Sequence, residues 1–323
     1  MSRIPRLWTL CATLLCAGAL AQTPGYPSKP LTLIVPYNAG GLTDQLAREI
    51  GVQLAQRLKQ PVLVENKPGG GAQIAMNALK QAPADGHTLV LADFGPLALN
   101  PNLFTRLSYD PRKDLQPVTQ LVSAPALLVV PRTSPYTSVE ALFQAARTQP
   151  GGLSYASAGV GSGGHLFGAM LSSKLGKPLT HIAYKGSAPG LTDLMGGQLD
   201  FMFDAITTSG AFAKTGKVRA LAIGAERRSP LFPDVPTLKE LGWASIVSTV
   251  WFGVVVKAGT PDAVVSRLNT ELVASLREPA VSKKLLDQGL ELVGSSPKQF
   301  TAHLHAEIAK WGPVIRDSGM TVD

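Results

Sequence analysis

A short apolar run, a glycine-rich turn and an amphipathic helix follow one another repeatedly along this chain. The first apolar run, Leu31–Val35, is nearly continuous, which is typical of a strand buried in a parallel sheet. Gly40 and Gly41 come next, and leucine or isoleucine then stands at every fourth position from Leu42 to Leu58, which predicts one apolar helix face. Such alternation gives a parallel sheet with helices on its faces, so we predict an α/β fold.

The same signals recur to near the C-terminus and divide into two sets. Further strands are predicted at Val62–Val64, Thr88–Leu91, Leu127–Val130, Leu153–Ser157, His181–Tyr184, Leu199–Phe203 and Val218–Ile223. Further helices are predicted at Gln73–Lys80, Val139–Phe143, Leu166–Leu175, Leu191–Met195, Asp262–Leu276 and Pro297–Ile315. Two such sets in 323 residues indicate two α/β domains. Apolar stretches near Val118–Leu128 and Val250–Val256 are expected to be extended joins, which makes the first domain discontinuous.

The N-terminus has the features of an export signal. Arg3 and Arg6 precede an uncharged apolar stretch, Leu7–Leu20, which ends in the small-x-small pattern Ala19-Leu20-Ala21. The stretch is too short to cross a hydrocarbon core of ~30 Å. We therefore predict cleavage after Ala21 and a periplasmic location, with a retained membrane anchor or a lipid on Cys16 as the alternatives.

Both cysteines of the chain, Cys11 and Cys16, lie in this predicted leader. A mature chain without cysteine has no disulfide, no thiolate nucleophile and no Cys-ligated metal. Metal binding through histidine is disfavoured as well, because His303 and His305 are two residues apart on a predicted helix and point in diverging directions. We expect no metal and no cofactor.

The charge of the chain argues against one class of partner. Its 30 Lys and Arg against 22 Asp and Glu leave a formal charge of +8, but no basic run is longer than two residues, as at Arg227-Arg228. Nucleic-acid binding needs basic residues gathered on one face, so we expect no nucleic-acid partner. The scattered positive charge instead favours anionic small molecules.

Two glycine-rich loops follow predicted strands and precede predicted helices. One is Pro36–Gly41; the other, Gly159–Gly164, matches the spacing of a dinucleotide fingerprint. That fingerprint also needs an acidic residue at the end of the next strand, but Lys185 follows His181–Tyr184. Even without a nucleotide, such loops let backbone N–H groups and a helix N-terminus approach an anion closely. We predict that they hold a carboxylate in a cleft, with ordinary βα turns as the alternative.

The sequence contains few motifs for catalysis. No His-Glu-x-x-His occurs, and Ser162 lacks the glycine two residues before it that a nucleophile elbow needs. Asp93 and Asp204 are more notable, because each follows an apolar strand, at the edge where a parallel sheet presents its ligand contacts. The alternative is that both are buried structural acids.

Five motifs stand in order between Tyr26 and the C-terminus. They are Ile34–Asp44, Glu65–Gly71, Gly159–Leu166, Tyr184–Pro189 with its continuation Gly196–Asp200 and Phe203-Asp204, and Pro233–Thr237. In this order and spacing the chain resembles the Bug/TctC family, the periplasmic solute receptors of tripartite tricarboxylate transporters. The resemblance implies a type II periplasmic-binding-protein fold, in which two α/β domains joined by extended hinge strands have a ligand cleft between them.

The predicted leader and the extended joins set the domain limits, and the resemblance implies a ligand class and a set of ligand contacts. We expect a signal peptide at 1–21, a first domain at 22–124 that resumes at 251–323, and a second domain at 125–250. The ligand of the family is usually a small carboxylate, held between the two glycine loops. The ligand-binding residues carried over are Tyr37, Asn38, Ala39, Gly40, Gly41, Thr43 and Asp44 in the first domain, and Ala158, Gly159, Gly161, Ser162, Gly163, His165, Lys185, Gly186 and Asp204 in the second.

Three departures from the family's pattern bear on the ligand. Asn38-Ala39 replaces a double proline, Ala169 replaces a glutamate, and Asp93 stands where asparagine, serine or threonine is common. An ionised Asp93 in the cleft would repel a plain carboxylate and favour a zwitterion such as an amino acid. The alternative is that Asp93 caps a turn at Gly95-Pro96.

The chain is therefore predicted to be a periplasmic receptor and not an enzyme. It would capture a small carboxylate by closing its two domains and deliver it, as a monomer, to membrane transporter subunits that it contacts transiently. Two alternatives stay open. One is an enzyme on the same fold, which would need a positioned acid–base pair or nucleophile, and the other is a ligand sensor read by a signalling partner.

Overall fold

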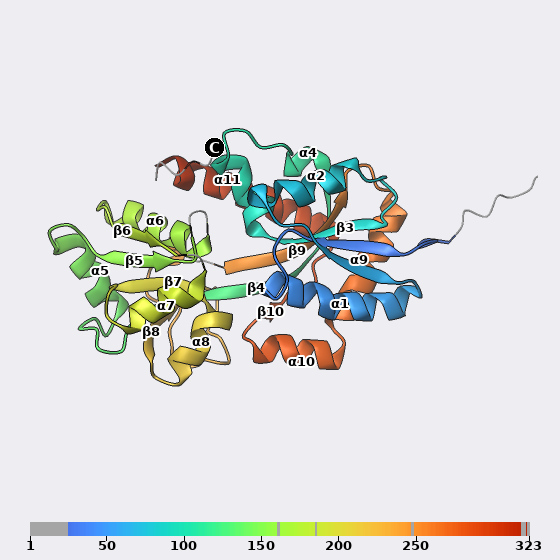
Figure 1. The fold of residues 1–323 in the computed structure, drawn as a ribbon. Coiled ribbons are helices and arrows are strands. Elements are labelled where there is room, and N and C mark those ends of the chain that lie inside the picture. Colours follow the sequence, from blue (N-terminus) through green and yellow to red (C-terminus); the bar gives the residue numbers. More distant parts are fainter. Residues whose placement is uncertain (1–24, 160–161, 185, 247–248, 318–320, 322–323) are drawn as a thin grey trace, which may run out of the picture.

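The computed structural model describes residues 25–159, 162–184, 186–246, 249–317 and 321. These residues form two α/β lobes joined by two long strands, β4 (Leu115–Pro131) and β9 (Thr249–Lys257) (Figure 1). The α/β class expected from the alternation of strands and helices is confirmed. The predicted leader, Gly161 and Lys185 lie outside the described residues.

The first lobe is built on a sheet of mixed direction. Its strands are, in order, β2 (Val62–Asn66), β1 (Leu31–Val35), β3 (Thr88–Asp93), β9 and the first part of β4. β1 is parallel to both of its neighbours, but β9 is antiparallel to β3 and to β4, and the short β10 (Glu291–Leu292) is also antiparallel to β4. The prediction of a parallel sheet is wrong for these strands, because β4 and β9 carry the chain out to the second lobe and back.

Side chains of the first-lobe strands alternate between two helical layers. Leu31, Leu33 and Val35 belong to one buried cluster with α1 (Leu42–Leu58) and α9 (Asp262–Leu276). Ile34 belongs to a second cluster with α2 (Gln73–Gln81) and α11 (Pro297–Asp317). Burial on both faces explains why this strand is almost continuously apolar. The remaining helical segments are η1 (Gly70–Ala72), the π-helical η2 (Gly95–Leu99), α3 (Asn100–Leu103), α4 (Pro111–Asp114) and α10 (Pro279–Asp287).

The second lobe repeats this arrangement on a smaller sheet. β5 (Ser154–Ser157) is parallel to β6 (Thr180–Ala183) and to β7 (Phe201–Ala205). The second half of β4 is antiparallel to β7 and to β8 (Val218–Ile223). The helical segments of this lobe are α5 (Val139–Thr148), α6 (Gly163–Leu175), α7 (Ser187–Met195), α8 (Ile206–Lys214) and η3 (Ala244–Ile246).

The sequence pattern misses α8, α10 and the short segments η1, η2, α3, α4 and η3, and it shortens α5, α6 and α7. α8 contains two threonines, a serine and a glycine, which have modest helix propensity, and it forms because Ile206, Ser209 and Gly210 are buried in the lobe. α10 is likewise not predicted. α7 begins at Ser187 rather than at Leu191, because Pro189 is tolerated in a first helical turn. No helix in the described part of the chain is long and apolar enough to cross a membrane.

Strand β4 belongs to both sheets. Its pairing with β9 extends to Pro125, opposite Thr249, and its pairing with β7 begins at Ala126, opposite Ala205. Every residue of β4 except Gln116 is buried. The two lobes therefore share a continuous, buried strand. The domain limit between residues 124 and 125 stays a prediction, and the change of pairing partner supports it.

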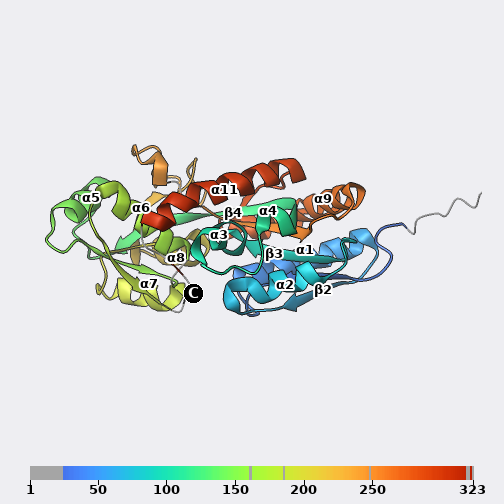
Figure 2. The ribbon, with the colours of Figure 1, turned by 90° about the horizontal axis from the view of Figure 1, so that it is seen from above.

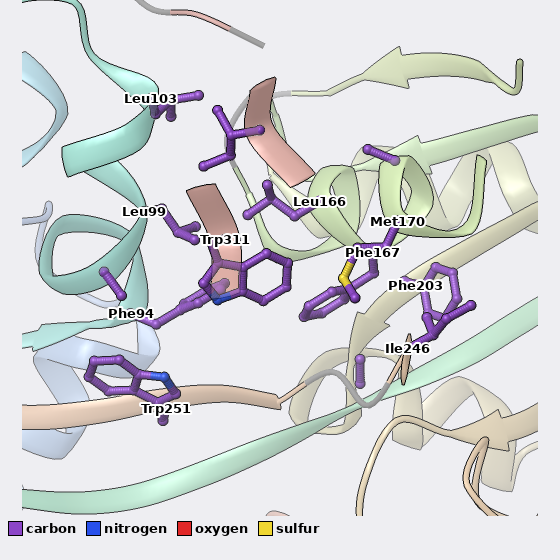
Figure 3. Close-up of a cluster of buried hydrophobic side chains, with 14 of the residues drawn as sticks. Phe94, Leu99, Leu103, Leu166, Phe167, Met170, Phe203, Ile246, Trp251 and Trp311 are labelled. Atoms are coloured by element: carbon purple, nitrogen blue, oxygen red, sulfur yellow. The ribbon is translucent and has the colours of Figure 1, made fainter. Parts of the chain in front are cut away.

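An aromatic cluster joins the lobes on the side of α11, which runs past α6 at one end and towards α9 at the other (Figures 2 and 3). The ring of Trp311 lies 6.2 Å from Phe94 of the first lobe and 6.0 Å from Phe167 of the second. The indole N–H groups of Trp311 and Trp251 both donate to Glu307 Oε2, over 3.0 and 3.2 Å. Trp311 is thus a buried side-chain contact between the two lobes.

Replacing Trp311 with alanine should reduce the free energy of unfolding by about 3–5 kcal/mol, because it removes a fully buried ring and one donor to Glu307. Trp311→Phe keeps most of the ring contacts and should cost less. Guanidinium unfolding followed by circular dichroism measures both variants. A loss below about 1 kcal/mol for Trp311→Ala, the level of an ordinary point mutation, would contradict this role.

Candidate functional site

The first glycine loop lies between β1 and α1 and presents Asn38, Ala39, Gly40 and Gly41 to solvent. Gly40 has φ 93°, a left-handed conformation that favours glycine. Gly41 precedes α1 without any side-chain cap on the helix. The first-turn N–H groups of α1 are therefore not capped by a side chain at the exposed face of the loop.

Asp44 lies on the buried side of this loop, is only 3% exposed, and bonds to the loop backbone. Its carboxylate accepts hydrogen bonds from Gly40 N (2.9 Å), Asn66 Nδ2 (3.0 Å) and Arg48 Nε (3.0 Å). The hydrogen bond from Arg48, followed by that from Gly40, lowers the pKa of Asp44 to about 2. Asp44 thus braces the loop from inside; a direct contact with ligand stays a prediction. Thr43 is buried as well.

Asn66 contributes to this site although we did not predict it as a site residue. Its side chain donates to the backbone oxygen of Tyr37 as well as to Asp44, both over 3.0 Å. It therefore ties the start of the loop to the start of α1. Its position in the Glu65–Gly71 motif, at the last residue of β2, was the only available signal.

Tyr37 and Asp93, from the ends of two neighbouring strands, form a hydrogen-bonded pair. The Tyr37 hydroxyl donates to Asp93 Oδ1 over 2.6 Å, and Gly95 N donates to the same oxygen over 3.1 Å. Burial raises the pKa of Asp93 to about 6, against the opposing effect of these hydrogen bonds. The bond from Gly95 N is the turn contact expected if Asp93 is a structural cap. The bond from the Tyr37 hydroxyl also orients Tyr37, which we predicted as a ligand contact.

The second glycine loop opens onto a small cavity of about 110 Å³ in the second lobe. The cavity brings together four of the predicted residues, Ala158, Ser162, Gly163 and Asp204. Gly164 also lines it, and a Cβ there would lie 2.5 Å from the Phe203 carbonyl oxygen, so only glycine permits this approach of α6 to β7. Predicted residues Gly159 and Gly186 flank the cavity, since Gly186 N donates to Ala158 O over 3.0 Å.

Two helix N-termini meet at this cavity. α6 and α7 begin directly after Ser162 and Gly186, and neither helix has a side-chain cap. Between them, Asp204 accepts hydrogen bonds from Ser187 Oγ over 2.6 Å and from Thr208 Oγ1, while burial raises its pKa. Ser187 was not predicted, although it begins the helix that follows Gly186. Uncapped helix N-termini are suited to holding a carboxylate.

His165 lies away from this cavity, in contrast to its predicted neighbours. It lines a separate cavity of about 450 Å³ with Tyr155, Lys177 and His181, at the other side of α6. Its ring stacks on that of His181 with centroids 3.8 Å apart. The direction in which the His165 side chain points depends on how α6 packs against the sheet. The spacing of the glycine motif does not reveal this packing.

Other features of the structure do not converge on the predicted residues. A cavity of about 920 Å³ lies between segments 227–231 and 286–293, and none of the predicted residues lines it. Among the described residues, no group of three or more His, Cys, Asp or Glu side chains is placed to hold a metal ion. His303 packs against Trp251 at 5.0 Å, while His305 is exposed.

Comparison with known proteins gives consistent matches over most of the chain. A family model described as "Tripartite tricarboxylate transporter family receptor" matches residues 46–320. Protein BugT of Bordetella pertussis is 34% identical over 295 residues, which cover 91% of this chain and 90% of BugT. The solved structure of R. palustris Rpa4515 with adipate has a TM-score of 0.79 and 35% identity, covering 92% of this chain and 99% of that one. MatC from Rhodopseudomonas palustris with bound malate has a TM-score of 0.77 and 32% identity, covering 90% and 100%.

Asp44→Asn should lower the free energy of unfolding by about 1–2 kcal/mol at pH 7, because the hydrogen bonds from Gly40 and Arg48 lose a charged acceptor. The pKa of Asp44 falls on folding from 3.8 to about 2. The stabilisation is therefore complete above about pH 4 and is lost as the pH falls towards 2. Urea unfolding across this pH range measures it. Asp287→Asn, at an exposed ion pair with Lys283, is the control and should change little. A gap between wild type and Asp44→Asn that is equal at pH 7 and pH 2 would contradict the assignment.

Proposed function

This chain belongs to the TctC family of tripartite tricarboxylate transporter receptors, and on that premise we propose that it captures a small carboxylate by closing its two lobes and delivers it to the membrane subunits of such a transporter. The family is one of periplasmic solute-binding receptors rather than enzymes. The solved relatives share its two-domain, periplasmic-binding-protein fold. Capture and release then follow from domain motion, with no bond made or broken.

The observation that carries this proposal is the convergence of α6 and α7 on the second-lobe cavity. Their N-termini supply backbone N–H donors and positive dipole ends for an anion. Two relatives at 35% and 32% identity hold adipate and malate, which supports a carboxylate as the ligand class.

The second-lobe cavity is half of the proposed site. At about 110 Å³ it is smaller than the roughly 300–1,000 Å³ usual for small-ligand pockets. The exposed loop Asn38–Gly41 and the pair Tyr37–Asp93 supply the other half from the first lobe. A ligand that contacts both halves favours the closed arrangement, because only closure lets it make both sets of contacts.

A carboxylate that binds the folded chain should stabilise it by about 2.7 kcal/mol at a hundredfold excess over Kd. For a chain of this size we expect a rise in melting temperature of about 5 °C. Thermal unfolding with a panel of mono- and dicarboxylates, including adipate, malate and amino acids, measures the shift. If no member of the panel moves the melting temperature, the receptor function is contradicted.

Two glycine variants provide the matched control for that panel. Gly40→Val places a β-branched residue at φ 93° in the proposed ligand loop, while Gly259→Val places one at φ 84° in a remote turn of the same lobe. Neither added Cβ meets another atom within 4 Å, so the backbone strain is comparable. Only Gly40→Val should weaken ligand binding, whereas equal affinity in both variants would place the ligand elsewhere.

A zwitterionic ligand, such as an amino acid, is the second candidate, favoured by the acid Asp93 beside Tyr37. With a pKa of about 6, Asp93 is mostly ionised at pH 7.5 and could pair with a cationic group. Asp93→Asn should then weaken a zwitterion by about 1.5–3 kcal/mol and leave or improve binding of simple carboxylates. Calorimetric titration of both ligand classes measures this. Equal losses of affinity for both ligand classes would contradict a role of Asp93 in choosing the ligand and would leave it a structural role only.

We extend the proposal to the location and state of the protein. The predicted leader ending at Ala21 supports export and a mature N-terminus at Gln22. The intact mass of the exported protein tests this, and light scattering tests the expected monomer. A ligand sensor with the same binding properties is distinguished by whether uptake of the ligand is lost on deletion of the protein.

A further inference from the structure

Ser157 connects the second glycine loop to a histidine on the next strand. It ends β5, is fully buried, and its Oγ lies 2.7 Å from Nε2 of His181 on β6. The same oxygen accepts a hydrogen bond from Gly159 N over 3.1 Å and lies 3.0 Å from Gly159 O. The Ser157 hydroxyl therefore connects His181 to the backbone of the proposed ligand loop.

The available donors and acceptors determine which atom receives the hydroxyl hydrogen of Ser157. A serine hydroxyl has a single hydrogen to donate, and a carbonyl oxygen has two lone pairs. Gly159 O already accepts from Ser162 Oγ over 2.7 Å and from Ser162 N over 3.1 Å. The hydrogen of Ser157 is therefore best donated to His181 Nε2, which requires that nitrogen to be unprotonated and the imidazole to carry its hydrogen on Nδ1.

The opposite state of His181 disturbs the loop. If Nε2 carried a hydrogen it would donate to Ser157 Oγ, and the Ser157 hydrogen would turn to Gly159 O. That carbonyl would then face three donors with two lone pairs, in competition with Ser162 Oγ. Since Ser162 lines the proposed ligand cavity, a hydrogen on His181 Nε2 would disturb the position of Ser162 in that cavity.

The surroundings of His181 favour the neutral ring. It stacks on His165 at 3.8 Å and packs against Tyr155 at 5.0 Å, so a charged ring would lie against another imidazole. Burial lowers the pKa of His181, and burial followed by the influence of His181 lowers the pKa of His165 to about 4. Lys177 and Asp317 are the other charged residues that line this cavity.

We propose that His181 is a positioning residue of the ligand site, whose Nδ1-protonated neutral tautomer acts through Ser157 to hold Gly159 and Ser162 in the arrangement that receives the carboxylate. This inference rests on the proposed function. The ring itself does not touch the ligand.

The tautomer is tested directly, without ligand, by ¹⁵N NMR of the histidine-labelled full chain at pH 7.5. His181→Phe identifies the His181 signals. We expect an unprotonated Nε2 for His181, and a protonated Nε2 at this pH would overturn the proposal. This measurement stands whether or not a carboxylate is found, so it separates failure of the inference from failure of the receptor function.

The effect on the site is tested by titration with adipate and malate as probes. His181→Phe and Ser157→Ala should each weaken the better probe by about five- to thirtyfold, the range for a buried hydrogen bond. The double variant should be no weaker than either single one, because both remove the same link. The matched control is Tyr155→Phe, which keeps the ring against His181 and loses only the hydroxyl bond to His165 O, so it should bind normally.

A pH series gives a readout that a purely structural role would not move. The ratio of affinities between wild type and His181→Phe should fall towards one as the pH is lowered through the pKa of His181, which an NMR titration of the wild type locates, because the wild type then loses the neutral ring. Comparing the two proteins at each pH removes the titration of the probe itself. Additive losses in the double variant, or a ratio that stays constant across the pKa of His181, would overturn the proposal. If His181→Phe fails to fold, His181→Gln takes its place for the signal assignment and the titrations.

Discussion

The antiparallel pairing of β4 with β9 is the interaction on which the rest of this structure depends. The pairing runs from Leu115 opposite Lys257 to Pro125 opposite Thr249, and β4 then continues directly into the second sheet. Because all but one of its residues are buried, β4 cannot separate from either sheet without exposing apolar surface and unpaired backbone groups. The two lobes are therefore held together by a strand that both sheets need.

Helix α11 adds a second connection that is made by side chains alone. Its Trp311 contacts Phe167, which also lines the second-lobe cavity, and Phe94, which follows Asp93 in the first lobe (Figure 3). A change in the angle between the lobes has to move one of these contacts. Cores are close-packed and switch between arrangements more readily than they deform. The aromatic cluster thus links the second-lobe cavity, which we propose holds the ligand, to the first lobe through directly packed rings.

The two glycine loops are braced in the same way by different residues. In the first lobe, Asp44 and Asn66 bond to the loop backbone from beneath. In the second lobe, Ser157 bonds to Gly159, with His181 behind it. A flexible glycine loop that must present its N–H groups to an anion loses less entropy on binding when it is already held in shape. Asp44 and Ser157 are themselves buried and hydrogen-bonded.

The sequence by itself determined the alternation of strands and helices, the two-domain α/β class and the positions of the glycine loops, because these follow from local periodicity and backbone conformation. β1, α1 and α9 were predictable from residues close together in the chain. Only the tertiary structure decided that β4 and β9 run antiparallel, that Asp93 bonds to Tyr37, and that His165 lies beside His181 rather than with Ser162. These contacts join residues from different elements, and a side chain's direction is fixed only when its helix or strand is packed against the others.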